Sequence, residues 1–169
     1  MVQSPIVDVF RYEGRQTMKA ATFGSDPQMV AKHAIAMKRG LNDGGVISMM
    51  KHFPGYGSIA TDAHKGTARI TKDLKSLENE DIVPFKALID DGIDGVMSGH
   101  VIAECIDDKY PATLSSALLR KYLREKLGFN GLVMTDAMRM KAIQDNYGTG
   151  TASVMAVNAG CDAVLLRGN

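Results

Sequence analysis

Two short stretches of this sequence gather side chains that can move protons, grip polar ligands or attack carbon. The first runs from Lys51-His52 to Asp62-Ala63-His64 and has a proline and two glycines between them. Glycine and proline favour irregular backbone, so we expect a loop that presents its polar groups. The second is Asp136, which directly follows the apolar run Leu132-Val133-Met134-Thr135. Polar groups at the ends of apolar runs predict an enzyme site on a parallel α/β scaffold.

Asp136 is the candidate nucleophile. A carboxylate at the C-terminal end of a buried parallel strand faces the mouth of a barrel, where catalytic groups collect. There it could attack an electrophilic carbon and form a covalent intermediate, as retaining glycosidases do. From position alone, the alternative is that Asp136 caps the next helix.

Asp62 and His64 form a candidate acid/base pair. Two residues apart on an extended segment, their side chains point the same way, so the carboxylate could orient the imidazole for proton transfer. The alternative is a solvated Asp-x-His on a loop.

Lys51, His52 and His100 are candidate pocket residues. Lys51 and His52 follow one apolar run and His100 follows another, Val96-Met97-Ser98-Gly99. Ammonium and imidazole groups at strand ends suit a pocket that binds hydroxyl groups. The alternatives are a structural histidine at His52 and a cap on the barrel rim at His100. The histidines are too scattered for a zinc motif, so we expect no metal site.

The elements that must position these groups alternate between strand and helix. Short apolar runs predict strands at residues 5–9, 46–50, 95–98, 132–135 and 162–166. Between them, capping residues and apolar spacing predict helices from residue 25 to 39, from the acidic residues 78–81 to about 91, from 115 to 127 and from 151 to 159. This order predicts a parallel α/β fold of the TIM-barrel type.

The length of the chain limits this barrel. A complete eight-stranded barrel usually needs ~250 residues, whereas this chain has 169. We therefore predict that residues 1–169 form a single, incomplete barrel domain with about five of the eight strands. An open sheet is the alternative.

Composition excludes several classes of partner. A net charge of +1 gives no electrostatic reason to bind nucleic acid or an anionic membrane. No apolar run approaches the ~18–20 residues that span a bilayer. Cys105 and Cys161 have no paired or metal-ligand spacing, and the first five residues do not resemble a signal peptide, so we expect a reducing, cytoplasmic location.

At these same residues the sequence resembles the bacterial β-N-acetylglucosaminidase branch of glycoside hydrolase family 3. The matching segments are Ser4-Pro5-Ile6-Val7-Asp8-Val9, Phe23-Gly24-Ser25-Asp26-Pro27, Lys51-His52-Phe53-Pro54-Gly55-Tyr56-Gly57 with Asp62-Ala63-His64, Val96-Met97-Ser98-Gly99-His100-Val101, Pro111-Ala112-Thr113-Leu114-Ser115 and Thr135-Asp136-Ala137-Met138. They occur in the order of the family and cover nearly the whole chain.

The resemblance implies a retaining, two-step hydrolysis of terminal β-linked N-acetylglucosamine, typically on muropeptide fragments from cell-wall turnover. It implies that Asp136 is the nucleophile and that His64, paired with Asp62, is the acid and base. Substrate-binding roles are implied for Lys51, His52, His100 and Met138. The resemblance implies no metal or organic cofactor.

Two departures from the family pattern affect this expectation. Ala21 stands where the family has a sugar-contacting arginine, so we expect Ala21→Arg to lower the Michaelis constant in a steady-state assay. Relatives also have further strands, and an incomplete barrel exposes sheet edges that favour self-association or a partner chain. The competing hypotheses are therefore an inactive barrel fragment and a sugar-binding piece that needs a partner chain.

Overall fold

The computed structural model describes residues 1–11, 20–57, 59 and 68–166. Asp62 and His64 lie outside these residues. The described elements are α2 (Pro27–Asp43), β1 (Met49–Phe53), β2 (Ala68–Ile70), α3 (Leu74–Glu80), α4 (Val83–Asp90), β3 (Gly95–Ser98), β4 (Val101–Ala103), η1 (Ala112–Leu114), η2 (Ala117–Lys126), β5 (Leu132–Thr135), α5 (Lys141–Tyr147) and α6 (Thr149–Ala159). The fold is α/β with parallel strands, as predicted.

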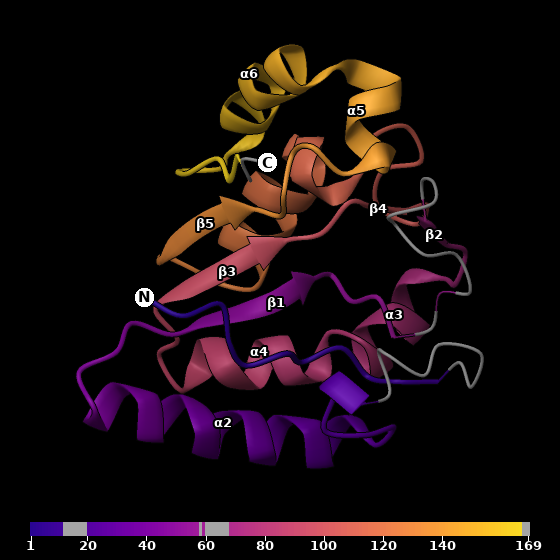
Figure 1. The fold of residues 1–169 in the computed structure, drawn as a ribbon. Coiled ribbons are helices and arrows are strands. Elements are labelled where there is room, and N and C mark those ends of the chain that lie inside the picture. Colours follow the sequence, from indigo (N-terminus) through magenta and orange to yellow (C-terminus); the bar gives the residue numbers. More distant parts are fainter. Residues whose placement is uncertain (12–19, 58, 60–67, 167–169) are drawn as a thin grey trace.

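The central sheet has the order β1-β3-β5, and both pairings are parallel. Two further segments extend it through isolated parallel bridges: Val2 and Ile6 pair with Ser48 and Lys51, and Ala163 pairs with Met134. Of the five predicted strands, three are therefore regular and the outer two are bridged segments. In Figure 1 the N-terminal segment, β1, β3 and β5 lie side by side in this order.

The second predicted strand is wrong by three residues. Residues 46–50 were expected, whereas β1 spans Met49–Phe53. Gly45 adopts a positive φ of 72°, and the Val46 amide donates to the Leu41 carbonyl, so both residues belong to the turn that leaves α2. Consequently Lys51 and His52 lie within the strand and not beyond it.

The predicted helices exist with different boundaries. Asp26 caps α2 by accepting hydrogen bonds from the amides of Gln28 and Met29 at 2.8 and 2.9 Å, as expected for an N-cap. The helix passes through Gly40, where we expected it to end, and stops at Gly44.

The helix expected after the acidic residues is two helices. Glu78 and Glu80 lie inside α3, and α4 starts at Val83 with a proline in its first turn, which cannot continue a preceding helix. The helix after Ser116 is confirmed as η2, a π-helix. The last helix begins at Thr149 instead of residue 151. The sequence did not predict α5, or the two-stranded parallel sheet of β2 and β4.

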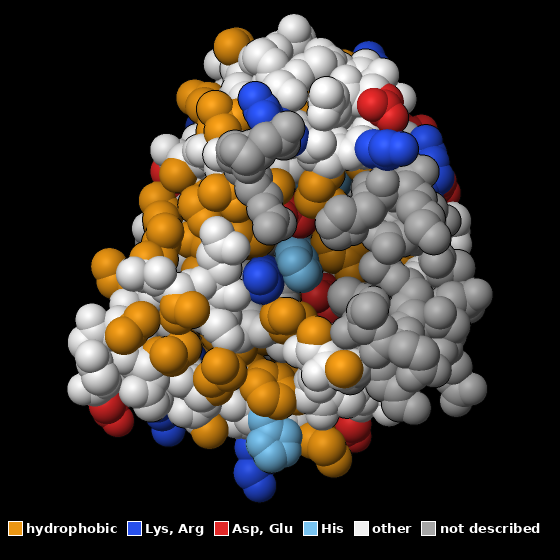
Figure 2. Space-filling model, in the orientation of Figure 1, with side chains coloured by type: hydrophobic (Ala, Val, Ile, Leu, Met, Phe, Trp, Pro, Cys, Tyr) orange, Lys and Arg blue, Asp and Glu red, His pale blue; other side chains and the backbone are white. Residues whose placement is uncertain are grey.

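One large apolar core joins the central sheet to its helices, and a smaller cluster lies apart from it. The smaller cluster contains Met49, Met97 and Met134, one from each strand, with Leu132, Ala163 and Leu165 packed against them. Figure 2 shows hydrophobic side chains gathered on the face of the molecule that Figure 1 presents, together with a histidine beside a basic side chain near its centre. None of the described helices is both long and apolar enough to cross a membrane.

Gly40 offers a test of the revised boundary of α2. It is exposed inside the helix, and an added Cβ would meet no heavy atom within 4 Å. Because alanine loses less backbone entropy than glycine on folding, we expect Gly40→Ala to raise the free energy of unfolding by about 0.5–1 kcal/mol. Urea denaturation followed by circular dichroism measures the change. A destabilised variant would contradict the boundary.

Candidate active site

The C-terminal ends of the three central strands meet at one edge of the sheet. Phe53, Ser98 and Thr135 are register partners across β1, β3 and β5. Backbone bonds continue past the strands: the Gly99 amide donates to Phe53 O at 2.8 Å, and the Asp136 amide donates to Ser98 O at 3.0 Å. The predicted positions of Lys51, His52, His100 and Asp136 therefore converge at this edge.

Asp136 is half-buried at the end of β5. Its Oδ1 accepts a hydrogen bond from the Ala137 amide at 2.7 Å. The next helix, α5, begins at Lys141 and its N-cap is Met140, so Asp136 does not cap a helix. This removes the structural alternative that its sequence position left open.

His52 is held by a buried carboxylate that the sequence analysis did not single out. Asp8 is 0% exposed, and its Oδ2 lies 2.8 Å from His52 Nδ1. Its Oδ1 accepts a hydrogen bond from the Tyr56 amide at 2.7 Å. Asp8 lies inside the predicted strand 5–9 and not after it, so the strand-end rule that pointed to Asp136 does not find it; a carboxylate within an apolar run is the signal that could have done so.

His100 connects the neighbourhood of β1 to that of β5. Its Nε2 lies 3.0 Å from the Ala137 carbonyl and its Nδ1 lies 3.0 Å from Thr113 Oγ1. A carbonyl only accepts, so Nε2 carries the proton. The Thr113 hydroxyl also lies within hydrogen-bond distance of the Ser98 and Gly99 carbonyls, at 3.1 and 2.9 Å. The His100 amide donates to Tyr56 Oη. The network thus runs from Asp8 through Tyr56 and His100 to the residue beside Asp136.

Burial separates the four predicted pocket residues into two classes. Lys51 and His52 are partly exposed, whereas His100 and Met138 are each 0% exposed. Met138 packs in the main core, and its amide donates to Leu165 O at 3.0 Å. Among the described residues, then, Lys51 and His52 have exposed surface, whereas His100 and Met138 have none. Contact of any of the four with a sugar stays a prediction.

Asp62 and His64 lie outside the described residues, but the chain on both sides of them is placed. Before them, Gly57 O accepts from the Arg11 amide at 2.9 Å. After them, β2 begins at Ala68, which pairs with Val101 directly after His100. Both flanks therefore lie near the edge that carries Asp136 and His52. Ala21, which stands at the position where the family has an arginine, is exposed.

A buried ionic cluster supports the turn that follows His52. The Asp81 side chain is 1% exposed, and its oxygens lie 3.3 Å from Arg11 Nη1 and 2.5 Å from Lys72 Nζ. Desolvation raises the pKa of Asp81, and the Lys72 and Arg11 cations oppose that rise. A Cβ on Gly55, whose φ is 121°, would lie 3.3 Å from Asp81 Cβ. The cluster therefore packs directly against the backbone of the turn.

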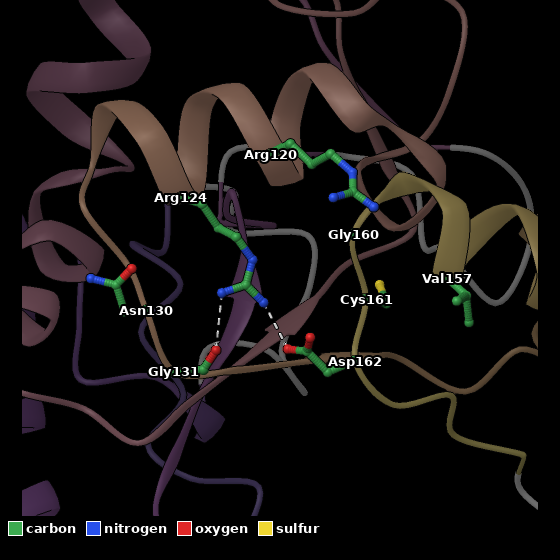
Figure 3. Close-up of a pocket in the computed structure, with 8 residues that line it drawn as sticks. All are labelled: Arg120, Arg124, Asn130, Gly131, Val157, Gly160, Cys161 and Asp162. Carbon is green, nitrogen blue, oxygen red and sulfur yellow. Dashed lines mark hydrogen bonds and ion pairs between the residues drawn. The ribbon is translucent and has the colours of Figure 1, made fainter.

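The opposite edge of the sheet holds a separate polar pocket. It is about 430 Å³ in volume and is lined by Arg120, Arg124, Asn130, Gly131, Val157, Gly160, Cys161 and Asp162 (Figure 3). Arg124 donates to Asp162 Oδ2 at 2.7 Å and to Gly131 O at 3.2 Å. Desolvation raises the pKa of the Cys161 thiol to about 11, which makes it a poor thiolate nucleophile. We assign this pocket a structural role.

Potential metal ligands do not gather in the part of the chain that the structure describes. No group of three or more His, Cys, Asp or Glu side chains is placed there so that it could hold an ion.

Known proteins resemble this chain over nearly its whole length. A β-hexosaminidase of Nitrosomonas eutropha is 38% identical over 164 residues, which are 96% of this chain and 46% of that protein. The chain thus spans about half the length of the curated relatives that it matches.

Solved structures give the same relationship. A glycoside hydrolase family 3 β-N-acetylglucosaminidase from a Paenibacillus species superposes with a TM-score of 0.95 at 34% identity, over 97% of this chain and 31% of that one. NagZ from Neisseria gonorrhoeae, solved with N-trifluoroacetyl-D-glucosamine, superposes with a TM-score of 0.84 at 32% identity, over 97% of this chain and 46% of that one. The family model "Glycosyl hydrolase family 3 N terminal domain" matches residues 1–169. The chain therefore belongs to glycosyl hydrolase family 3.

Proposed function

We propose that this chain carries the active site of a glycosidase that releases terminal β-linked N-acetylglucosamine. One observation carries the proposal: Asp136 directly follows β5, at the sheet edge where β1, which contains Lys51 and His52, and the buried His100 after β3 also lie. Relatives named β-hexosaminidase, and a neighbour solved with an N-acylated glucosamine, support the sugar class.

The proposed mechanism has two steps. Asp136 attacks the anomeric carbon and forms a covalent glycosyl-enzyme, while His64, oriented by Asp62, protonates the leaving oxygen. His64 then removes a proton from a water molecule, which attacks the same carbon and releases Asp136. Both displacements invert the anomeric carbon, so the product retains the β configuration. The proposed chemistry needs no metal or organic cofactor.

We also propose the biological setting that the family resemblance suggests. The substrate would be a muropeptide fragment from cell-wall turnover, processed in the cytoplasm. The two outer bridged segments occupy the edges of the described sheet. We propose that further βα units, from a longer polypeptide or a partner chain, complete a barrel at these edges.

The test is hydrolysis of an aryl β-N-acetylglucosaminide by the purified chain, with the anomer of the first product followed by proton NMR. We expect β product and a loss of about 10²–10⁴-fold in kcat/KM for His64→Ala on a substrate with a poor leaving group. His33→Ala is the matched control, because His33 is exposed on α2. Equal background in all three proteins would refute catalysis by this chain and favour an inactive piece. α product would refute retention.

A further inference from the structure

Asp8 is a buried carboxylate that the proposed mechanism does not use. It is 0% exposed, and N–H groups contact both of its oxygens. Oδ2 lies 2.8 Å from His52 Nδ1, while Oδ1 lies 2.7 Å from the Tyr56 amide nitrogen and 3.4 Å from that of His52. An ionised carboxylate is costly to bury unless it is hydrogen-bonded in this way. All of these partners belong to the segment that follows the middle of β1.

This contact decides which nitrogen of His52 carries the proton. The carboxylate only accepts hydrogen bonds, so Nδ1 is the donor and, in the neutral ring, Nε2 is the acceptor. The Tyr56 ring packs edge-on against the imidazole, with centroids 5.2 Å apart at an angle of 67°. The His52 side chain is 16% exposed, so the ring keeps an accessible edge while two neighbours fix its plane.

We propose that Asp8 is a positioning residue that fixes His52 with Nε2 as a hydrogen-bond acceptor for a hydroxyl group of the sugar. The inference rests on the proposed function and deepens it. Lys51, the preceding residue, supplies an ammonium group that only donates. A hydroxyl group can donate to Nε2 and accept from an ammonium group at once. An O-methyl ether at the same sugar position can only accept, so this arrangement selects against it.

His100 provides an internal reference for the first measurement. Its Nε2 faces the Ala137 carbonyl, so its neutral ring holds the opposite tautomer, with the proton on Nε2. Long-range ¹⁵N–¹H NMR at alkaline pH should therefore show one Nδ1–H and one Nε2–H imidazole at these two positions. An Nε2–H tautomer at His52 in the wild-type chain would overturn the proposal.

The variant Asp8→Asn keeps the shape of the side chain and changes its hydrogen bonding. The amide oxygen remains opposite the two backbone N–H groups, so the amide nitrogen faces His52 Nδ1 and donates to it. We expect His52 to switch to the Nε2–H tautomer while His100 does not change. Asp94→Asn is the matched control. Asp94 Oδ2 also accepts hydrogen bonds from β1's flank, from the amide and hydroxyl of Ser48 at 3.0 and 3.1 Å, but Ser48 precedes the N-terminal end of the strand and not His52. No switch in Asp8→Asn, or the same switch in Asp94→Asn, would overturn the proposal.

The second measurement is steady-state kinetics on the aryl N-acetylglucosaminide. Loss of one hydrogen bond to the sugar predicts a rise of about 3–10-fold in KM for Asp8→Asn, with a smaller change in kcat. In a His52→Phe background, Asp8→Asn should add no further effect, because Asp8 acts through His52. An additive effect would overturn the proposal. If the wild-type chain does not turn over the substrate either, the proposed function fails, whereas the NMR result still tests whether Asp8 sets the tautomer of His52.

Discussion

Replacing Asp136 with alanine is expected to reduce hydrolysis of the aryl N-acetylglucosaminide by at least about 10³-fold in kcat, since the variant lacks the group that forms the covalent intermediate. The structure places this carboxylate at the end of β5, half-buried and outside any helix cap. Its loss should therefore affect chemistry far more than folding. Asp145→Ala is the control, because Asp145 is an exposed acid on α5.

Two further readouts separate a nucleophile from a residue that only shapes the site. A slowly turned over fluorosugar should add the mass of one glycosyl group to the wild-type chain and none to Asp136→Ala. Azide should restore part of the activity of the variant, by attacking from the face that Asp136 vacates and giving the α-glycosyl azide. Labelling of the variant, or full activity without azide, would assign the nucleophile to another residue.

Gly57→Ala is expected to be the most destabilising single methyl addition among the described glycines. An added Cβ would lie 1.8 Å from the Val9 carbonyl oxygen and 2.3 Å from the Val9 carbonyl carbon. Both are backbone atoms, so no side-chain rotation relieves the clash. Val9 follows Asp8, and Gly57 is held by the Arg11 amide, so one segment would have to move away from the other.

We expect this variant to lose about 3 kcal/mol or more in the free energy of unfolding. For a chain of this length the loss corresponds to a fall of roughly 6–12 °C in Tm. Thermal and urea denaturation measure the change, with Gly40→Ala as the control for adding the same methyl group where space is open. A Gly57→Ala chain as stable as the wild type would show that the two segments do not approach this closely.

The strand ends were the most predictable part of the site. Apolar runs located β3 and β5 correctly, and the rule that polar groups gather at the C-terminal ends of parallel strands placed Asp136 and His100 at one edge. The run at 46–50 was misleading because Val46 is apolar but belongs to the turn after α2, whereas Ile47 only accepts a hydrogen bond from the Val2 amide before β1 begins. Hydrophobicity alone does not distinguish a buried strand from an apolar turn.

Contacts between distant residues were not predictable in the same way. Asp8 and His52 lie 44 positions apart, and so do Tyr56 and His100. The pairing of β2 with β4 likewise depends on where the chain returns in space. The local sequence pattern identified His52, His100 and Asp136 as candidates. Which residues contact the two histidines depends on the tertiary fold, and the local pattern does not contain that information.

The order of the central strands bears on how the protein is made. Along the sheet, the N-terminal segment, β1, β3, β5 and the segment around Ala163 follow one another in the order of the sequence. Each strand can therefore dock on a neighbour that has already left the ribosome, without waiting for a later part of the chain. During synthesis each new strand therefore adds to the same edge of the sheet. A pause in translation between β3 and β5 would leave the ends of β1 and β3, at Phe53 and Ser98, paired before Asp136 is made.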